Sequence, residues 1–234
     1  MYDVSLIIPA LDEAASIEAV VSASLAIGIG EAIVVDNGST DDTARIARAA
    51  GARVISEPRR GYGRACAAGV AAVRPGARAV AFLDGDGSDV PLALVDLARL
   101  VLEERADFAI GSRTRGVRER KSLSPLQMFA GRVAGCLVGI FFGKHYSDMG
   151  PQRVIDRVAL ARLPMSEETY GWNLQMQILA AHAKLRIVEL PVPHRCRCGG
   201  ESKVSGNPHA AWVAMFRIAL VFARSLTLSR SDAT

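Results

Sequence analysis

The stretch Ala79-Val80-Ala81-Phe82-Leu83-Asp84-Gly85-Asp86 joins five apolar residues directly to two acids separated by one glycine. A short run that is apolar throughout is typical of a strand buried on both faces, as in a parallel sheet. Two carboxylates at this spacing after a strand can reach one hard cation such as Mg²⁺ or Mn²⁺. Taken alone, the pair is equally compatible with a solvated turn that caps a following helix. The stretch therefore predicts a buried strand with a candidate metal site at its carboxyl end.

Outward from this strand, a short β-branched run followed by an amphipathic run occurs four times in residues 4–104. The expected strands are Val4–Pro9, Ala32–Asp36, Ala52–Ser56 and Ala79–Asp84, and the expected helices are Ser16–Ala26, Asp41–Ala50, Gly63–Val73 and Pro91–Glu104. Buried strands that alternate with helices indicate a sheet covered on both faces. The pattern predicts a doubly wound, mostly parallel α/β fold for residues 1–112.

Residues 113–234 are less regular, and we expect them to complete one continuous domain with C-terminal helices. The expected elements are a basic loop (113–121), an apolar helix (124–142), a turn (147–151), a helix (172–183), a strand (185–190), a Gly-rich loop to 207 and a closing helix (209–229). This divides the single domain into two halves, 1–112 and 113–234.

Composition narrows the classes of protein. The 234 residues are 50% hydrophobic and 22% charged, the balance of a soluble globular protein. The longest charge-free apolar stretch, Val133–Gly143, is shorter than the roughly 18 to 20 residues of a membrane span, which argues against an integral membrane protein. No leader pattern opens the chain, and four cysteines form no disulfide framework, so we expect a cytoplasmic protein.

The net charge of +4 is too small to indicate a nucleic-acid partner. Its placement is more informative, because five basic residues and one acid lie between Arg113 and Lys121. This basic loop directly precedes the apolar helix, and cations beside an apolar surface suit an anionic lipid headgroup. A core helix behind a solvated loop is the alternative.

Ligands of open α/β sheets bind at the carboxyl ends of the strands, so the residues just after each strand are the candidates for function. Three polar clusters stand there: Pro9–Glu13, Asp36–Asp42 and Asp84–Asp89. Asp36 is a candidate acceptor for a base N–H or a ribose hydroxyl. Ser39 or Thr40 is expected to cap the helix that follows.

Together these segments, with Gly61-Tyr62-Gly63-Arg64-Ala65 and Ser147–Pro151, resemble the motifs of family 2 glycosyltransferases of the GT-A type, in the same order and spacing. Within that family the chain is most similar to polyprenyl-phosphate sugar transferases, such as dolichyl-phosphate mannosyl- and glucosyltransferases. Arg195–Gly206 fits a later motif, so the resemblance covers nearly the whole chain.

The resemblance implies a GT-A nucleotide-diphospho-sugar transferase fold and assigns roles to individual residues. Residues implied in the nucleotide pocket are Pro9, Leu11, Glu13, Asp36 and Asp84. Asp84 and Asp86 would hold Mg²⁺ or Mn²⁺ on the diphosphate of the donor. Family members often have Asn at position 12 and a metal-assisting Gln at position 88, whereas this chain has Asp12 and Ser88. The third metal ligand is then expected to be Asp89 or water.

The catalytic set expected from this resemblance is Asp86, Asp148, Arg195 and Lys203. Arg195, Arg197 and Lys203 lie on the Gly-rich loop, which could close over the diphosphate and supply positive charge. We expect Arg113, Ser147 and Ser202 to contact the acceptor.

The expected chemical class of the acceptor follows from the absence of an acid in one segment of the sequence. A hydroxyl acceptor needs a general base, yet Tyr170–Gln175, where related hydroxyl-directed enzymes place one, contains no acid. A phosphate monoester is already a competent nucleophile at neutral pH. Asp148 stays available as a base for a hydroxyl acceptor.

The function expected is therefore an inverting, metal-dependent transfer of a hexose from a UDP- or GDP-sugar to a polyprenyl phosphate. The protein would work in the cytoplasm, with peripheral contact at the inner face of the plasma membrane, and homo-oligomers are compatible with the sequence. Two alternatives remain: a same-fold transferase acting on a hydroxyl of a soluble small molecule or glycan, and a binding module for nucleotide sugars or lipid phosphates without turnover.

Overall fold

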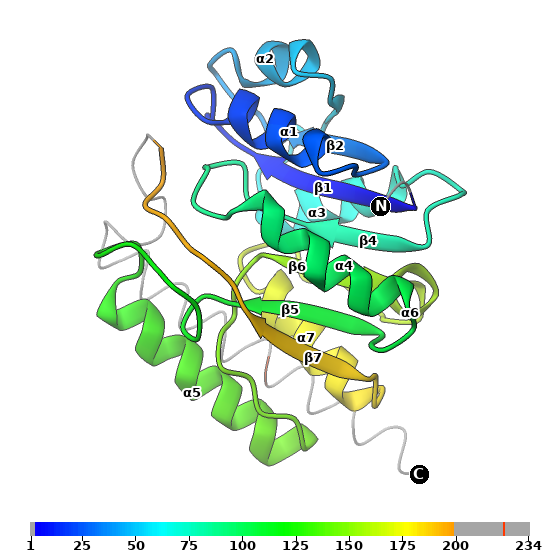
Figure 1. Cartoon of the computed structure of the whole chain (residues 1–234), viewed down its shortest axis with the longest axis vertical. Helices are drawn as coiled ribbons and strands as arrows, with labels where there is room; N and C mark the ends of the chain where they lie inside the picture. Colours follow the sequence, from blue (N-terminus) through cyan, green and yellow to red (C-terminus); the bar gives the residue numbers. More distant parts are fainter. Residues whose placement is uncertain (1–2, 199–221, 223–234) are drawn as a thin grey trace.

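The computed structural model describes residues 3–198 and residue 222, and its centre is one seven-stranded sheet (Figure 1). The strands are β1 (Val4–Ala10), β2 (Glu31–Asp36), β3 (Arg53–Ser56), β4 (Ala79–Phe82), β5 (Phe108–Ser112), β6 (Arg153–Asp156) and β7 (Ile187–Pro191). Their order is β3-β2-β1-β4-β6-β5-β7. Strands β3, β2, β1 and β4 run parallel to one another, and β5 is parallel to β7, whereas β6 is antiparallel to both β4 and β5. The predicted mostly parallel α/β fold is confirmed.

Helices cover both faces of this sheet. The helices are α1 (Ile17–Ala26), α2 (Thr43–Ala49), α3 (Tyr62–Ala71), α4 (Leu94–Leu102), α5 (Pro125–Phe142), α6 (Arg157–Ala161) and α7 (Trp172–His182), and a 3₁₀ turn, Pro91–Ala93, precedes α4. The alternation of side chains along β1 divides the core between the faces. Ile7 packs into a cluster with α3 and α7, whereas Leu6 and Ile8 pack into a second cluster with α1 and α4. Each layer buries the apolar side of its helices.

The sequence pattern predicted none of three short elements, β5, β6 and α6, and β6 is the most informative of them. It has only four residues and begins with a charged side chain, Arg153, so its apolar run is just Val154-Ile155. Arg153 is fully buried and donates hydrogen bonds to the carbonyl oxygens of Pro151 and Asn173. A strand whose buried residues include a guanidinium gives no apolar signal. The strand also joins the two halves, because β6 lies between β4 and β5.

The helix cap expected at Ser39 or Thr40 is wrong. Helix α2 begins at Thr43, with Asp42 at the N-cap position. The Ser39 hydroxyl instead accepts a hydrogen bond from the Asp12 amide at 3.0 Å, and the Thr40 amide donates to the Asp12 carboxylate at 2.7 Å. These side chains tie the loop after β2 to the loop after β1. Together they fix the carboxyl-end edge of the sheet.

Helix α5 lies along one edge of the molecule (Figure 1) and has well-defined ends. Ser124 and Gln127 form a reciprocal capping box at its start, and Gly143, with φ of 74°, ends it in the left-handed conformation. By length and composition, this 18-residue helix could cross a membrane, and only a small share of its residues is buried. The charge-free run Val133–Gly143 is thus only part of an apolar helix that also takes in Arg132 and the residues before it, and the absence of a membrane span stays a prediction.

Candidate active site

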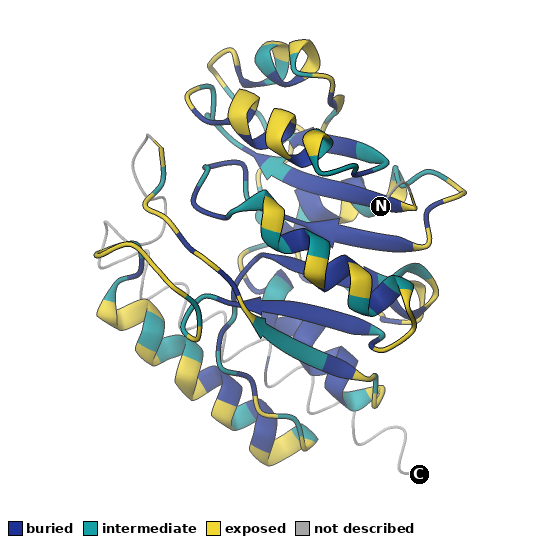
Figure 2. Ribbon diagram, in the orientation of Figure 1, coloured by how far each residue is buried: buried dark blue, intermediate teal, exposed yellow. Residues whose placement is uncertain are grey.

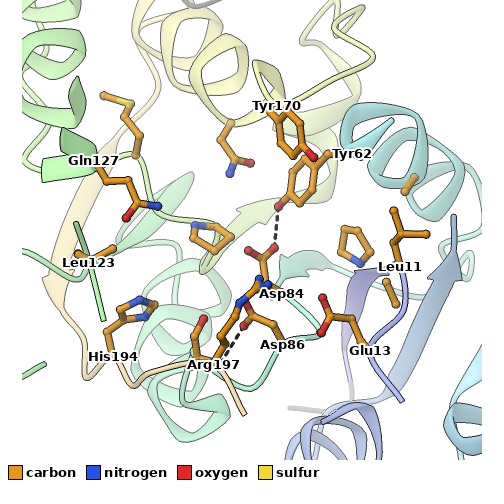
Figure 3. A pocket seen from close by; sticks show the side chains of 18 of the residues that line it. Leu11, Glu13, Tyr62, Asp84, Asp86, Leu123, Gln127, Tyr170, His194 and Arg197 are labelled. Carbon is orange, nitrogen blue, oxygen red and sulfur yellow. Dashed lines mark hydrogen bonds and ion pairs between the residues drawn. The ribbon is translucent and has the colours of Figure 1, made fainter. Parts of the chain in front are cut away.

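A cavity of about 910 Å³ lies at the carboxyl ends of β1, β2 and β4. Figure 3 shows Asp84 and Asp86 in the middle of the view, Leu11 and Glu13 on one side of them and Gln127 on the other. We call the side lined by Pro9, Leu11, Glu13, Asn37, Arg60 and Gly61 the donor end. The acceptor end is lined by Arg113, Lys121, Leu123, Ser124 and Gln127.

Asn37 organises the donor end. Its side-chain amide donates to the carbonyl oxygens of Glu57 and Arg59 at 2.8 and 2.9 Å, and its carbonyl oxygen accepts from the Gly61 amide at 2.8 Å. Gly61 has φ of 154°, and a Cβ there would collide with the Glu168 carbonyl oxygen, so the position requires glycine. The loops that line the donor end are thereby held at fixed separations.

Three of the residues predicted for the nucleotide pocket by the β1 motif, Pro9, Leu11 and Glu13, line the donor end. Asp36 does not line the cavity: it is half-buried at the end of β2, and its carboxylate accepts from the Ser39 amide at 3.0 Å. In this structure Asp36 shapes the loop beside the donor end. Its contact with a nucleotide stays a prediction.

The two acids of the strand-end pair lie in different electrostatic surroundings. Burial, followed by the charges of Asp86 and Asp89, raises the pKa of Asp84 to about 8, although its carboxylate accepts from the Tyr62 hydroxyl at 3.0 Å. Burial also acts against ionisation of Asp86, but hydrogen bonds from Ser88 and Arg197 outweigh it and hold the pKa of Asp86 below its usual value. The Arg197 guanidinium contacts Asp86 at 2.6 Å (Figure 3).

These residues fit a divalent cation of the magnesium type. Within residues 3–198, no three His, Cys, Asp or Glu side chains gather closely enough to form a complete metal cage. Mg²⁺ usually takes only one or two carboxylates and completes its shell with water and substrate phosphates, which matches Asp84 and Asp86. Burial, together with the charges of Asp86 and Asp89, disfavours the ionised form of Asp84, which raises its pKa, and a bound cation would favour that form.

His194 is a cavity residue that sequence reasoning missed, since we interpreted the isolated histidines as structural. It is buried, lines the cavity, and places Nδ1 3.3 Å from the buried carboxylate of Asp89. Its position in the sequence could have indicated this, because His194 follows strand β7. Since β7 is parallel to β5, residues after both strands lie at the same edge of the sheet. The carboxylate of Asp89, expected with water as a candidate third metal ligand, thus contacts the imidazole of His194. The backbone amide of Ser88 donates a hydrogen bond to the Asp86 carboxylate.

Arg113 lines the acceptor end and is held there by Asp148. The guanidinium donates two hydrogen bonds of 2.8 Å to the Asp148 carboxylate, and the Arg113 amide adds a third of 2.9 Å. The Met149 amide donates a fourth at 2.8 Å. Burial opposes ionisation of Asp148, yet these bonds hold the pKa of its carboxyl below the usual value. A carboxylate so engaged is a weak base, so the structure favours Asp148 as a positioning residue for Arg113 over the expected base.

The amino-acid sequence from residue 5 to 179 matches the family model described as glycosyl transferase family 2. This match covers most of the chain and includes every strand except β7. The chain belongs to glycosyltransferase family 2. The family expected from the motifs is confirmed.

Curated relatives agree with this family. An uncharacterized glycosyltransferase of Mycobacterium tuberculosis (strain ATCC 25618 / H37Rv) is 38% identical over 221 residues, which cover 91% of this chain and 94% of the relative. A dolichyl-phosphate hexose transferase of Haloferax volcanii is 32% identical over 190 residues, 80% of this chain and 78% of the relative. Both comparisons span most of each protein.

Solved structures confirm the fold. Glucosyl-3-phosphoglycerate synthase from Mycobacterium tuberculosis, in complex with Mn²⁺, UDP-glucose and phosphoglyceric acid, superposes with a TM-score of 0.73 at 22% identity, covering 95% of this chain and 79% of that chain. Another crystal structure of that protein contains Mg²⁺ and UDP. This likeness establishes the GT-A fold for the glycosyltransferase described here.

The remaining predicted site residues of this glycosyltransferase fall into three groups. Arg195 is exposed, does not line the cavity, and contacts the site through its amide, which donates to the Ser88 carbonyl oxygen. The neighbouring Arg197 lines the cavity in its place. Ser147 also stays outside the cavity, where its hydroxyl pairs with Ser112 and Glu189. Ser202 and Lys203, with the Gly-rich loop beyond 198 and most of the closing helix, lie outside the described residues.

Proposed function

We propose that this glycosyltransferase moves a hexose, with inversion, from a UDP- or GDP-hexose to a polyprenyl phosphate in the presence of Mg²⁺ or Mn²⁺. The observation that carries the proposal is the ion pair between Asp148 and Arg113. Within the part of the chain that the structure describes, this pair leaves the acceptor end with a guanidinium and with no unpaired carboxylate that could act as a base. Among the described residues that line the cavity, the acids are Glu13, Asp84 and Asp86, all at the donor end or in the middle. Such a site suits an acceptor that is already anionic.

The donor would lie with its nucleotide at the donor end and its diphosphate at Asp84 and Asp86. A divalent cation bound there would stabilise the negative charge that develops on the leaving diphosphate. Arg197 is placed to add positive charge at the same point, because it already reaches Asp86. In this arrangement the sugar faces the acceptor end.

The acceptor phosphate would bind Arg113, whose guanidinium is fixed by two bonds to Asp148. One phosphate oxygen attacks the anomeric carbon of the sugar, a new carbon–oxygen bond forms, and the bond to the donor diphosphate breaks with its electron pair leaving on the nucleoside diphosphate. The acceptor dianion has no proton to lose. A base is therefore unnecessary, and accurate positioning provides the catalytic advantage.

A second candidate keeps the donor chemistry and replaces the lipid by a small anionic acceptor. It is favoured by the structural relative, glucosyl-3-phosphoglycerate synthase, which was crystallised with phosphoglyceric acid. Its acceptor is a soluble molecule, whereas the curated relative from Haloferax volcanii is named for transfer to dolichyl phosphate. Arg113 would serve either anion.

The test is a transfer assay with Mn²⁺, a panel of UDP- and GDP-hexoses, and two acceptors, polyprenyl phosphate in detergent and phosphoglyceric acid. Mass spectrometry of the products is expected to show a polyprenyl-phosphohexose. A product formed only from phosphoglyceric acid would replace the lipid proposal by the second candidate. Donor binding in a thermal-shift assay, with no transfer to any acceptor and no hydrolysis, would support a binding module instead.

A further inference from the structure

Helix α5 carries a line of exposed apolar side chains that faces away from the protein. Leu126, Phe129, Val133 and Ile140 are 49%, 66%, 42% and 67% exposed. At 3.6 residues per turn, these four positions fall within about 60° of one another around the helix axis. Single exposed apolar residues are ordinary, but a continuous line of them marks an interaction surface. We call these four residues the apolar stripe.

The opposite face of α5 is fastened to the domain. Ala134, Gly135, Val138 and Gly139 are buried, and a Cβ at Gly135 would collide with the Tyr146 carbonyl oxygen. Figure 2 shows exposed positions along the outer side of α5. A helix packed this closely along the protein cannot be surrounded by lipid on all sides. Its geometry is that of a helix lying on a membrane, with the apolar stripe toward the lipid.

Exposed cations stand at the amino-terminal end of the stripe. Arg115, Arg118, Arg120 and Lys121 are all exposed, and Val117 between them is 85% exposed. Each cation near an anionic leaflet contributes attraction of about 1 kcal/mol, and the exposed valine can enter the interface beside them. A protein partner would have to combine an apolar groove with an acidic rim, whereas an anionic bilayer offers both features at once.

We propose that the apolar stripe and the cations of residues 115–121 dock this protein on an anionic membrane surface. The proposal deepens the proposed function and rests on it, because the lipid acceptor resides in that membrane. The far end of α5 is occupied differently, since Phe222 lies edge-on to Phe141 with ring centroids 6.0 Å apart. Phe141 is therefore not part of the apolar stripe.

The amino-terminal end of α5 and the residues just before it also line the cavity. Lys121, Leu123 and Gln127 belong both to the segment beside the docking surface and to the acceptor end. Figure 3 shows Leu123 and Gln127 on the same side of the cavity. A lipid phosphate taken from the bilayer would reach Arg113 by passing these residues, while its polyprenyl chain stays in the lipid beside the stripe. Membrane docking and acceptor delivery would thus use one continuous surface.

The experiment is co-sedimentation of the full chain with vesicles of phosphatidylcholine, alone or mixed with phosphatidylglycerol, and without polyprenyl phosphate. The parent protein is expected to bind the mixed vesicles and to be released by high salt. The variant R118Q/R120Q should bind up to about 30-fold more weakly, or about 5-fold per charge. The variant F129Q/I140Q should bind at least about tenfold more weakly at any salt concentration.

Matched controls come from exposed residues elsewhere on the molecule. R48Q/R99Q removes two exposed charges, and V158Q removes an exposed apolar side chain, so both are expected to bind as the parent does. None of the substituted residues lines the cavity, so donor hydrolysis and the melting temperature should not change.

Two results would overturn docking: a parent protein that does not bind mixed vesicles, or F129Q/I140Q that binds them as the parent does. If the stripe joins two copies of the chain, F129Q/I140Q would instead lower the mass measured by sedimentation velocity and leave vesicle binding unchanged. The proposed function is tested separately, by transfer to polyprenyl phosphate dispersed in detergent. If the protein transfers hexose to polyprenyl phosphate in detergent but does not bind vesicles, the docking proposal is refuted and the proposed function stands. If it binds vesicles but does not transfer hexose to polyprenyl phosphate in detergent, the lipid acceptor is refuted and docking stands.

Discussion

The two ends of the cavity are built in different ways. The donor end comes from short loops that directly follow β1, β2 and β3, and hydrogen bonds of Asn37 and Asp12 connect these loops to one another. The acceptor end combines segments far apart in sequence, for example Arg113 held by Asp148 and Gln127 on α5. The donor end is thus fixed by local geometry, and the acceptor end by long-range pairs. Substitutions at the donor end should therefore change binding of the donor, and substitutions at the acceptor end should change binding of the acceptor.

The largest effect is expected from Asp86→Ala, in the middle of the cavity. Loss of this carboxylate removes a candidate metal ligand and the partner of Arg197, so Mn²⁺-dependent turnover should fall about 10²- to 10³-fold. The melting temperature should hardly move. Steady-state kinetics against a series of Mn²⁺ concentrations checks this, with the exposed acid Asp96→Ala as the control. Normal turnover of the donor by Asp86→Ala would refute the metal assignment.

The next effect concerns the acceptor end, where Asp148→Asn should lower the free energy of unfolding by about 2 to 4 kcal/mol, because it leaves the mostly buried Arg113 without its charge partner. The KM for the acceptor should rise while the donor KM stays the same. Since the folded pKa of Asp148 lies below its usual 3.8, its contribution to stability is present above about pH 4 and is lost as the pH falls further.

The control for Asp148→Asn is Asp107→Asn, which weakens the exposed pair with Arg186 and should cost less than about 1 kcal/mol of stability. Denaturant unfolding and the pH profile of kcat are the measurements. A kcat that loses its dependence on one ionisation in Asp148→Asn, with unchanged stability, would restore Asp148 as the general base.

At the donor end, Asp36→Ala should weaken binding of the nucleotide sugar by about 1.5 to 3 kcal/mol if the carboxylate contacts the nucleotide. Calorimetry gives the dissociation constant. Ser39→Ala is the matched comparison, because it loosens the same loop by removing the bond to the Asp12 amide and keeps Asp36. Equal losses in the two variants would mean that Asp36 acts only through the loop.

The smallest effect is expected from Tyr62→Phe, which removes the hydroxyl that donates to Asp84. The loss of one such bond should weaken Mn²⁺ binding by about 1 kcal/mol, or roughly fivefold, without changing the melting temperature. Titration of Mn²⁺ by calorimetry would measure it. Unchanged affinity would indicate that the hydroxyl does not orient Asp84.

The same contrast between the ends explains what the sequence could predict. Pro9, Leu11, Glu13 and Asp84 were candidates because they stand at or just after the ends of buried strands, and the resemblance to family 2 glycosyltransferases implied their place in the nucleotide pocket. The place of His194 in the cavity and the ion pair between Asp148 and Arg113 were not predicted. Both involve contacts, His194 with Asp89 and Asp148 with Arg113, that form only when the chain folds. Strand β6 was not predicted for a related reason. Its buried Arg153 donates hydrogen bonds to carbonyl oxygens, and no sequence pattern reveals these contacts.

The position of β6 also constrains how the chain folds. Strand β5 contacts only β6 and β7 in the sheet, so residues 108–112 have no neighbour among the first four strands. Until residues 153–156 leave the ribosome, β4 presents an unpaired edge that can pair with other chains. We therefore expect a fragment of residues 1–112 to aggregate, whereas a fragment extended through residue 198 completes the sheet and can fold as one cooperative unit.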